Sequence, residues 1–194
     1  MLPALANNKD LAISFSQELP RYFHKNEIET ILMNSEDQHR DHLLMSVLWK
    51  TGARISESLR LRTKDIDFYG KAIRLTTLKR KQFMERVLPM QGHLVGLLGA
   101  HIAARRIQRD DLIFDFTRQR AYQIVSDAVL KAGFDQERAH PHIFRHSFAV
   151  HCVLSGVPIL VIKEWLGHSN IQNTLIYLKV LGSDTRHFYD AIKF

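Results

Sequence analysis

Helical periodicity runs through most of the chain and is interrupted once, by two strand-like segments. Apolar residues recur at helical spacing over residues 28–32 and again over residues 43–48. Residues 72–77 and 85–89, by contrast, have the β-branched composition of strands. Because only one pair of strands is expected, the sequence predicts an α+β fold, a mostly helical domain with one small antiparallel β-sheet.

Glycine and proline divide the rest of the chain into further helices. Gly52 follows the second apolar stripe as a C-terminal cap, and a short helix is expected over residues 55–61. The basic stretch at residues 78–84 is predicted to be the tip of a hairpin between the two strands. The remaining helices are expected at about residues 91–105, 117–132, 142–155, 158–166, 171–180 and 185–193.

The ends of the chain and its cysteine usage restrict the class of protein. No stretch approaches 18 consecutive apolar residues, and the N-terminus lacks the basic and apolar regions of a signal peptide, so a cytoplasmic protein is expected. Residues 1–18 are polar and weakly patterned, which indicates a tail before a compact body. The only cysteine, Cys152, lies in an apolar run and is assigned to the core.

Positive charge is concentrated in one part of the sequence. The formal net charge is +7, and the segment from Arg54 to Arg86 contributes +6 of it, with ten basic and four acidic residues. A concentrated basic surface is typical of a protein that binds a polyanion such as DNA. A soluble basic protein without such a partner would show the same charge, so charge alone leaves both open.

Three polar residues near the C-terminus could carry chemistry. His142 and Arg145 are three residues apart, so on a helix both lie on one face and could hold an anionic group, although a solvated polar face is the commoner reason for such a pair. His168 follows Leu166-Gly167, where glycine can end a helix in the left-handed conformation and turn the next side chain inward.

Four segments, in order and in spacing, resemble the successive boxes of the tyrosine recombinase (phage integrase) family. They are Thr51-Gly52-Ala53-Arg54-Ile55-Ser56-Glu57, His142-x-x-Arg145-His146, Leu166-Gly167-His168 and Tyr177. The resemblance begins near Leu19 and implies a catalytic domain over residues 19–182. The resemblance does not include the separate N-terminal core-binding domain that most members have. The chain therefore resembles either an excised catalytic domain or compact recombinases such as the fimbrial inversion enzymes.

The resemblance implies site-specific DNA recombination through a 3′-phosphotyrosine intermediate, with Tyr177 as the nucleophile. Arg54 and Arg145 would bind the nonbridging phosphate oxygens, since guanidinium groups stay charged and donate paired hydrogen bonds. His142 fits the general base, and His168 fits a hydrogen bond to a nonbridging oxygen.

In the family a hairpin lysine protonates the leaving 5′ oxygen, and Lys79 is the expected general acid, with Lys81 as a rival. This assignment is the least direct, because the hairpin tip at residues 78–84 is expected to be longer than the family's usual one. Glu57 lies one helical turn from Arg54 and could orient it or form an ordinary surface salt bridge.

The implied chemistry requires no cofactor and no metal, since the phosphate bond is conserved in the link to tyrosine. Although His142 and His146 are four residues apart, the sequence has no cysteine cluster, HExxH motif or carboxylate cage for a metal, and no P-loop or GxGxxG. Further DNA contacts are expected from basic residues around the hairpin and the first box, namely Arg60, Arg62, Lys64, Arg80, Lys81 and Arg86.

The expected partner is double-stranded DNA, on which the protein would assemble as a homo-oligomer, a tetramer in the synaptic complex, with accessory DNA-bending proteins possible. Residues 183–194 are expected to form a C-terminal helix that protomers could exchange, although folding back on its own domain is equally compatible with the sequence. Two other functions stay open: a type IB topoisomerase that lets one strand swivel, and a DNA-binding regulator that has lost catalysis.

Overall fold

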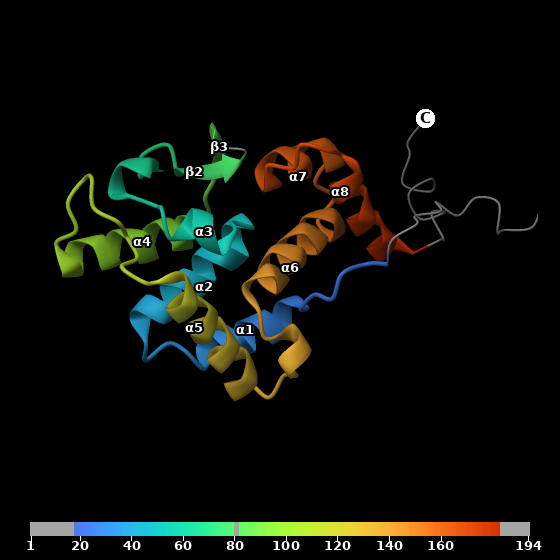
Figure 1. Cartoon of the computed structure of the whole chain (residues 1–194), viewed down its shortest axis with the longest axis horizontal. Helices are drawn as coiled ribbons and strands as arrows, with labels where there is room; N and C mark the ends of the chain where they lie inside the picture. Colours follow the sequence, from blue (N-terminus) through green and yellow to red (C-terminus); the bar gives the residue numbers. More distant parts are fainter. Residues whose placement is uncertain (1–17, 80–81, 183–194) are drawn as a thin grey trace, which may run out of the picture.

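The computed structural model describes residues 18–79 and 82–182. The helix expected at residues 185–193 and two of the expected DNA-binding residues, Arg80 and Lys81, lie outside these ranges. Within them the fold class is confirmed, because the protein is mostly helical and carries one small antiparallel sheet at the edge of the helical body (Figure 1). In these ranges no helix is both long enough and apolar enough to cross a membrane.

Helices α1 (Lys25–Met33) and α2 (His39–Thr51) form where the apolar stripes predicted them. The stripe of α2 lies inside the protein, with Leu44, Val47 and Leu48 fully buried. Gly52 ends α2 with a φ of 61°, and an added Cβ would lie 2.4 Å from the ring of Phe148. Glycine is therefore required there both for the backbone conformation and for the close packing of α6.

The segment after α2 folds into short elements that lead to the sheet. Helix α3 (Ile55–Ser58) is shorter than expected, and the 3₁₀ helix η2 (Thr63–Asp65) leads into strand β1 (Ile66–Asp67). Strands β2 (Ala72–Lys79) and β3 (Gln82–Pro89) pair along their whole lengths in the order β1-β2-β3. The first strand is an addition to the two that the sequence predicts.

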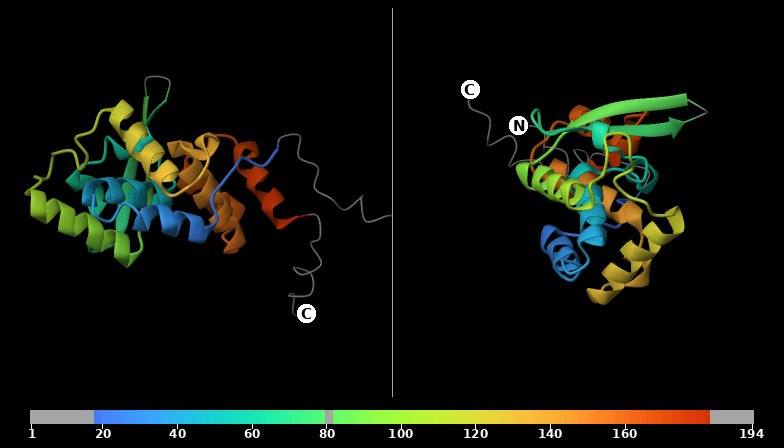
Figure 2. Two further views of the ribbon diagram at one scale, coloured as in Figure 1. Left: turned by 90° about the horizontal axis from the view of Figure 1, so that it is seen from below. Right: turned by 90° about the vertical axis from the view of Figure 1, so that its left-hand side faces the viewer.

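The hairpin corrects an expectation from the sequence. Pairing continues from Ala72 opposite Pro89 to Lys79 opposite Gln82, so only two residues separate the strands. Residues 78, 79 and 82–84, expected in a long tip, are strand residues instead. The β2–β3 hairpin projects beyond the helices (Figure 2), and Phe83 and Met84 near its end are largely exposed.

The remaining helices are α4 (Gly92–Arg105), α5 (Arg118–Lys131), α6 (Pro141–Leu154) and α7 (Ile159–Leu166), with the 3₁₀ helix η3 (Gln136–Arg138) between α5 and α6. The helix expected at residues 171–180 is divided into α8 (Gln172–Leu175) and the 3₁₀ helix η4 (Ile176–Leu181). Helix α6 packs against both α2 and η4.

Two apolar clusters form the interior. The larger joins α1, α2, α5 and the inner face of the sheet, and the smaller joins α6, α7 and η4. Cys152 belongs to the smaller cluster, which confirms its assignment to the core, and burial raises the pKa of its thiol to about 12. Residues 141–147 on the first turns of α6 lie where the two clusters meet, and this is where the polar residues of the sequence boxes gather.

Candidate active site

Arg145 is buried at the junction of the two clusters, with a relative exposure of 3%. Its Nη1 donates to the carbonyl of Gly52 at 2.7 Å, and its Nη2 donates to the carbonyl of Leu166 at 2.5 Å. These carbonyls lie at the C-terminal ends of α2 and α7, where helix dipoles favour a cation. Two separate helices thus fix one guanidinium.

A guanidinium has five N–H groups. Among the described residues, only two carbonyls accept hydrogen bonds from the guanidinium of Arg145. The other N–H groups are free to bind an anion. Burial and the nearby Arg54 lower the pKa of Arg145 to about 9, so the side chain still carries its charge at neutral pH. Arg145 is therefore a fixed cation with unused donors.

Arg54 supplies a second cation close to the first. It lies between Gly52 and α3, and its Nη1 donates to Glu57 Oε1 at 2.8 Å while its side chain stays 29% exposed. The backbone N–H of Arg54 donates to Glu57 Oε2, also at 2.8 Å. The carboxylate of Glu57 therefore holds both the side chain and the backbone of Arg54.

Glu57 is not a surface residue, because its relative exposure is 1%. Besides Arg54, it accepts hydrogen bonds from Arg86 and from the hydroxyl of Thr77. Burial opposes ionisation of this carboxyl, but the bonds and charge of Arg86 outweigh it and lower its pKa to about 2. The structure thus decides between the two sequence interpretations in favour of orienting Arg54, with a buried hub in place of a surface pair.

Tyr177 is buried on η4, with a relative exposure of 3%. Its hydroxyl shares a hydrogen bond of 2.8 Å with Nδ1 of His146 on α6. Burial raises the pKa of Tyr177 to about 12, although the charges of Arg145 and Arg54 act in the opposite direction. The phenol is therefore protonated at neutral pH and lies in the field of two arginines.

His146 was not predicted as a site residue. The sequence box contains it, and its spacing of four from His142 places both on one face of α6, with ring centroids 6.4 Å apart. Burial, then the charges of His142 and Arg145, lower the pKa of His146 to about 4, so the ring is neutral at pH 7. His146 thus holds the tyrosine hydroxyl, a position that the sequence analysis gave to His142.

The two histidines expected at the site lie near the same arginines. His142 is an exposed residue in the first turn of α6, and desolvation followed by the charge of Arg145 lowers its pKa. His168 follows Gly167, which ends α7 with a φ of 64° as the sequence predicts, and its Nδ1 contacts the hydroxyl of buried Thr174 at 2.9 Å. Burial and the charge of Arg145 lower the pKa of His168 to about 3.

The expected DNA-binding residues divide into two groups. Arg60 and Lys64 are exposed, Arg62 is partly exposed, and Lys64 and Arg62 contact Asp110 through its carboxylate and its carbonyl respectively. Arg86, by contrast, has a side chain that is 11% exposed, and its guanidinium bonds to Glu57 and to the carbonyl of Trp165, so its role as a DNA contact stays a prediction.

Lys79 is the last residue of β2 and pairs with Gln82. It lies two residues beyond Thr77, the strand residue that contacts Glu57. This places the backbone of the expected general acid in the strand that adjoins the Arg54 site. Its rival, Lys81, lies outside the described residues.

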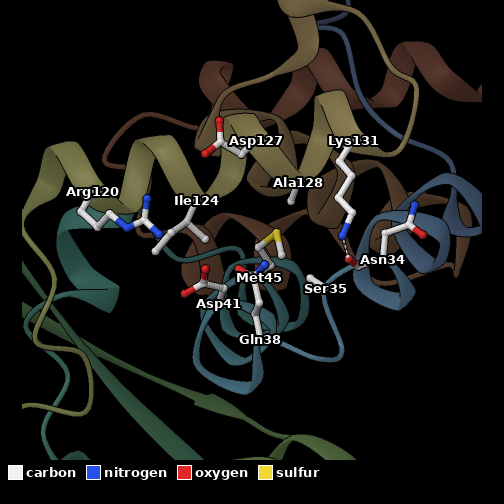
Figure 3. A pocket seen from close by; sticks show the side chains of 10 residues that line it. All are labelled: Asn34, Ser35, Gln38, Asp41, Met45, Arg120, Ile124, Asp127, Ala128 and Lys131. Carbon is white, nitrogen blue, oxygen red and sulfur yellow. Dashed lines mark hydrogen bonds between the residues drawn. The ribbon is translucent and has the colours of Figure 1, made fainter.

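A separate polar pocket between α2 and α5 contains none of the expected site residues (Figure 3). It has a volume of about 210 Å³ and includes Asp41, Arg120 and Lys131. Among the described residues, no three His, Cys, Asp or Glu side chains come together as a metal site, either here or at the arginine cluster formed by Arg54, Arg86 and Arg145. The chemistry that the structure supports at the cluster is stabilisation of an anion beside a tyrosine.

Comparison with known proteins identifies the family. The family model described as "Phage integrase family" matches residues 21–183, so the chain belongs to the phage integrase family. A tyrosine recombinase of Pseudothermotoga lettingae is 31% identical over 180 residues, which cover 91% of this chain and 61% of that protein. The chain therefore spans about three fifths of that relative's length.

Solved structures agree with this assignment. The crystal structure of XerA recombinase is similar with a TM-score of 0.76 and 26% identity, covering 92% of this chain and 68% of that one. The catalytic domain of bacteriophage HP1 integrase has a TM-score of 0.67 and 28% identity, covering 89% of this chain and 94% of that one.

Proposed function

We propose that this chain is the catalytic domain of a site-specific DNA recombinase that cleaves and rejoins strands through a 3′-phosphotyrosine intermediate. The observation that carries the proposal is the hydroxyl of Tyr177, held by His146 in the field of Arg145 and Arg54. A phosphodiester resists attack by a second anion, so a protein nucleophile needs fixed positive charge around the phosphorus. The buried Arg145 and the neighbouring Arg54 provide that charge.

Arg54 and Arg145 bind the two nonbridging oxygens of the scissile phosphate. Arg145 is preorganised by two helix ends and Arg54 by Glu57, so neither must reorganise when charge accumulates in the transition state. His168 donates a further hydrogen bond: when Thr174 donates to its Nδ1, the ring proton is on Nε2 and available to the phosphate.

Tyr177 must lose its proton during attack. In the DNA-free chain both His142 and His146 have lowered pKa values and are neutral at pH 7, the state that can accept a proton. His146 holds the hydroxyl in this resting state, and His142, an exposed residue in the first turn of α6, acts as the general base once DNA is bound. Lys79 protonates the 5′ leaving oxygen.

The substrate is double-stranded DNA, bound along the surface that carries Arg60, Arg62 and Lys64. Recombination needs two DNA sites, so the active assembly is a homo-oligomer, a tetramer in the synaptic complex. This assembly acts on nucleoid DNA in the cytoplasm. It can use accessory DNA-bending proteins. No metal or cofactor takes part in the proposed steps, because the phosphotyrosine link conserves the energy of the phosphate bond.

Covalent capture tests the proposal directly. The chain is incubated with a pool of nicked duplexes of random sequence, in which a cleaved strand loses the short fragment needed for rejoining. Wild-type protein is expected to yield denaturation-resistant adducts whose DNA can be sequenced, and Tyr177→Phe to yield none while binding DNA within a few fold. An adduct that persists in Tyr177→Phe would show that another residue is the nucleophile.

A second experiment separates strand exchange from the other functions. With the captured sequence placed twice in one plasmid, a recombinase inverts or excises the segment between the sites, a topoisomerase only relaxes the plasmid, and a silent regulator does neither. Removal of residues 183–194 is expected to reduce recombination but to leave cleavage of a nicked single site, because this segment docks on a neighbouring protomer in a head-to-tail assembly. Equal recombination by the shortened chain would contradict the exchange.

A further inference from the structure

Arg86 lies on β3 in a place where an arginine is unusual. Its strand partner Leu75 is fully buried, and two residues along the strand Leu88 is buried too, so Arg86 belongs to the inner face of the sheet. Polar atoms nevertheless surround the guanidinium there. The sequence offers no reason for a charged residue inside the hairpin, and the proposed catalytic steps do not use it.

One guanidinium joins three segments that are far apart in the sequence. Nη2 donates to Glu57 Oε2 at 2.7 Å and Nη1 to Glu57 Oε1 at 3.0 Å, while Nη1 also lies 3.2 Å from the hydroxyl of Thr77. Nε donates to the carbonyl of Trp165 at 2.6 Å. The contacts thus connect α3, β2 and the end of α7.

The contacts with Glu57 and Trp165 each lead to a proposed phosphate-binding arginine. Glu57 Oε1 also accepts the bond from Arg54 Nη1. Trp165 precedes Leu166, whose carbonyl accepts the bond from Arg145 Nη2. Through the carboxylate of Glu57 and through the backbone of residues 165–166, Arg86 therefore reaches the supports of both cations.

Gly167 packs directly on the same side chain. A Cβ added there would lie 3.2 Å from both Cδ and Nη1 of Arg86. This glycine stands between Leu166, which supports Arg145, and His168. The turn that carries His168 therefore rests on Arg86 as well as on its own left-handed backbone.

We propose that Arg86 is a positioning residue that sets the separation of Arg54 and Arg145 and ties the hairpin to both. The inference rests on the proposed function, because it concerns the geometry of the same phosphate site. Lysine cannot replace the arginine, since a single ammonium lacks the planar fork that reaches a carboxylate and a carbonyl at once. Loss of the fork leaves the two catalytic cations charged but no longer fixed relative to each other.

The test compares Arg86→Lys with Arg74→Ala, a control that removes an exposed arginine of β2 in the same hairpin. Among the described residues, Arg74 forms one ion pair, a 3.7 Å contact with Glu85. Single-turnover cleavage is measured at saturating DNA on the captured duplex. Arg86→Lys is expected to cleave at least about tenfold more slowly, towards the ~10²-fold typical of losing one preorganised donor. Arg74→Ala is expected to cleave like wild type.

A second substrate distinguishes positioning from general damage to the fold. A methylphosphonate at the scissile position replaces one charged oxygen with a neutral methyl group, so the reaction needs less positive charge. The deficits of Arg86→Lys and of Arg54→Ala are both expected to shrink to a few fold on this substrate. A deficit of Arg86→Lys that is equal on both substrates, or absent on both, overturns the proposal.

A double variant guards against loss of folding. In Arg86→Met with Glu57→Gln both charges of the buried Glu57–Arg86 pair are removed together, so neither is left buried without the other, although Arg54 also loses its carboxylate partner. This variant is expected to keep a cooperative melting transition and to show the same slow cleavage with rescue by the methylphosphonate. Cleavage at the wild-type rate by this folded variant would contradict a positioning role.

A DNA-free measurement keeps this inference separate from the proposed function. In arginine-labelled protein, the guanidinium N–H signals of Arg54 and Arg145 are expected to be resolved in wild type and in Arg74→Ala, and averaged by rotation in Arg86→Lys. Unchanged signals in Arg86→Lys refute positioning whatever the protein does to DNA. Absence of any wild-type adduct, with the signals behaving as expected, refutes only the recombinase proposal.

Discussion

Two buried carboxylates in this protein are held in opposite ways. Glu57, beside the arginine cluster, accepts hydrogen bonds from two arginines and a threonine. Asp41, in the pocket between α2 and α5, is 9% exposed, and no described residue forms a hydrogen bond or ion pair with its carboxylate. The pKa of Glu57 is lowered to about 2, whereas burial raises that of Asp41 despite the charges of Arg120 and Arg40.

The difference shows what distinguishes the proposed active site from an ordinary polar pocket. Burial alone disfavours a charge, so a charged group inside a protein persists only when other groups compensate it. At Glu57 the compensating groups are Arg86, Thr77 and Arg54, the last of which is a proposed phosphate ligand. At Asp41 the charges of Arg120 and Arg40 and the N-terminus of α2, in whose first turn it lies, favour ionisation but do not outweigh burial.

The largest expected effect comes from removing the paired carboxylate. Glu57→Ala leaves Arg86 buried with only Thr77 and a carbonyl as partners, and breaking a buried pair in this way costs about 3–5 kcal/mol. Asp41→Ala removes a carboxylate without such partners and is expected to change the free energy of unfolding by no more than about 1 kcal/mol. Urea unfolding of both variants at pH 7 measures the difference, and equal losses would remove the distinction between the two sites.

The second effect concerns catalysis. Arg145→Lys keeps the charge but cannot reach the carbonyls of Gly52 and Leu166 together, and cleavage of the captured duplex is expected to fall by about 10². Lys131→Ala is the matched control in the pocket, because Lys131 also donates to a backbone carbonyl, that of Asn34 at 3.1 Å. Single-turnover rates should be normal for the control. Normal cleavage by Arg145→Lys would make Arg145 a structural residue only.

Sequence reasoning succeeded where local backbone chemistry decides the structure. Gly52 and Gly167 were predicted to end helices, and both adopt positive φ at those ends. The packing of Arg145 onto the two helix ends could not be predicted, because it joins residues 93 and 21 positions apart. The sequence boxes identify these residues. Only the tertiary structure shows that the guanidinium of Arg145 bonds to the boxes that contain Gly52 and Leu166.

Arg86 shows how tertiary structure overrides a strand pattern. In a half-buried strand, alternation would place Val87 inside and Arg86 in solvent. The register does the reverse, leaving Val87 60% exposed and Arg86 inside, because Leu88 and Leu75 set the inner face. The partner that makes an inward arginine acceptable is Glu57, 29 residues earlier. No local pattern contains that information.

His146 was detectable in principle. Its spacing of four from His142 was considered only as a metal pair, whereas the same spacing also places it on the face of α6 that meets Tyr177. What the sequence could not supply was the position of η4 against α6, because residues 171–180 were expected to form one regular helix, whereas the structure divides this segment into α8 and η4.

The smallest expected effect, and the sharpest test of the comparison, is the pH dependence of stability at the two carboxylates. The pKa of Glu57 is lowered in the folded chain, so its contribution is present above its unfolded value of about 4.5 and is lost as the pH falls from there towards 2. The pKa of Asp41 is raised, so its contribution is fullest below its unfolded value of 3.8 and is lost as the pH rises through its folded value. Glu57→Gln should therefore flatten the acid side of the stability curve. Asp41→Asn should make the protein more stable than wild type at pH 7, on the order of 1 kcal/mol or less, and the gain should disappear in acid. Urea unfolding of each variant between pH 3 and pH 8 gives both curves. If the difference between Asp41→Asn and wild type is the same at every pH, Asp41 does not ionise unfavourably, and the contrast between the two buried carboxylates fails.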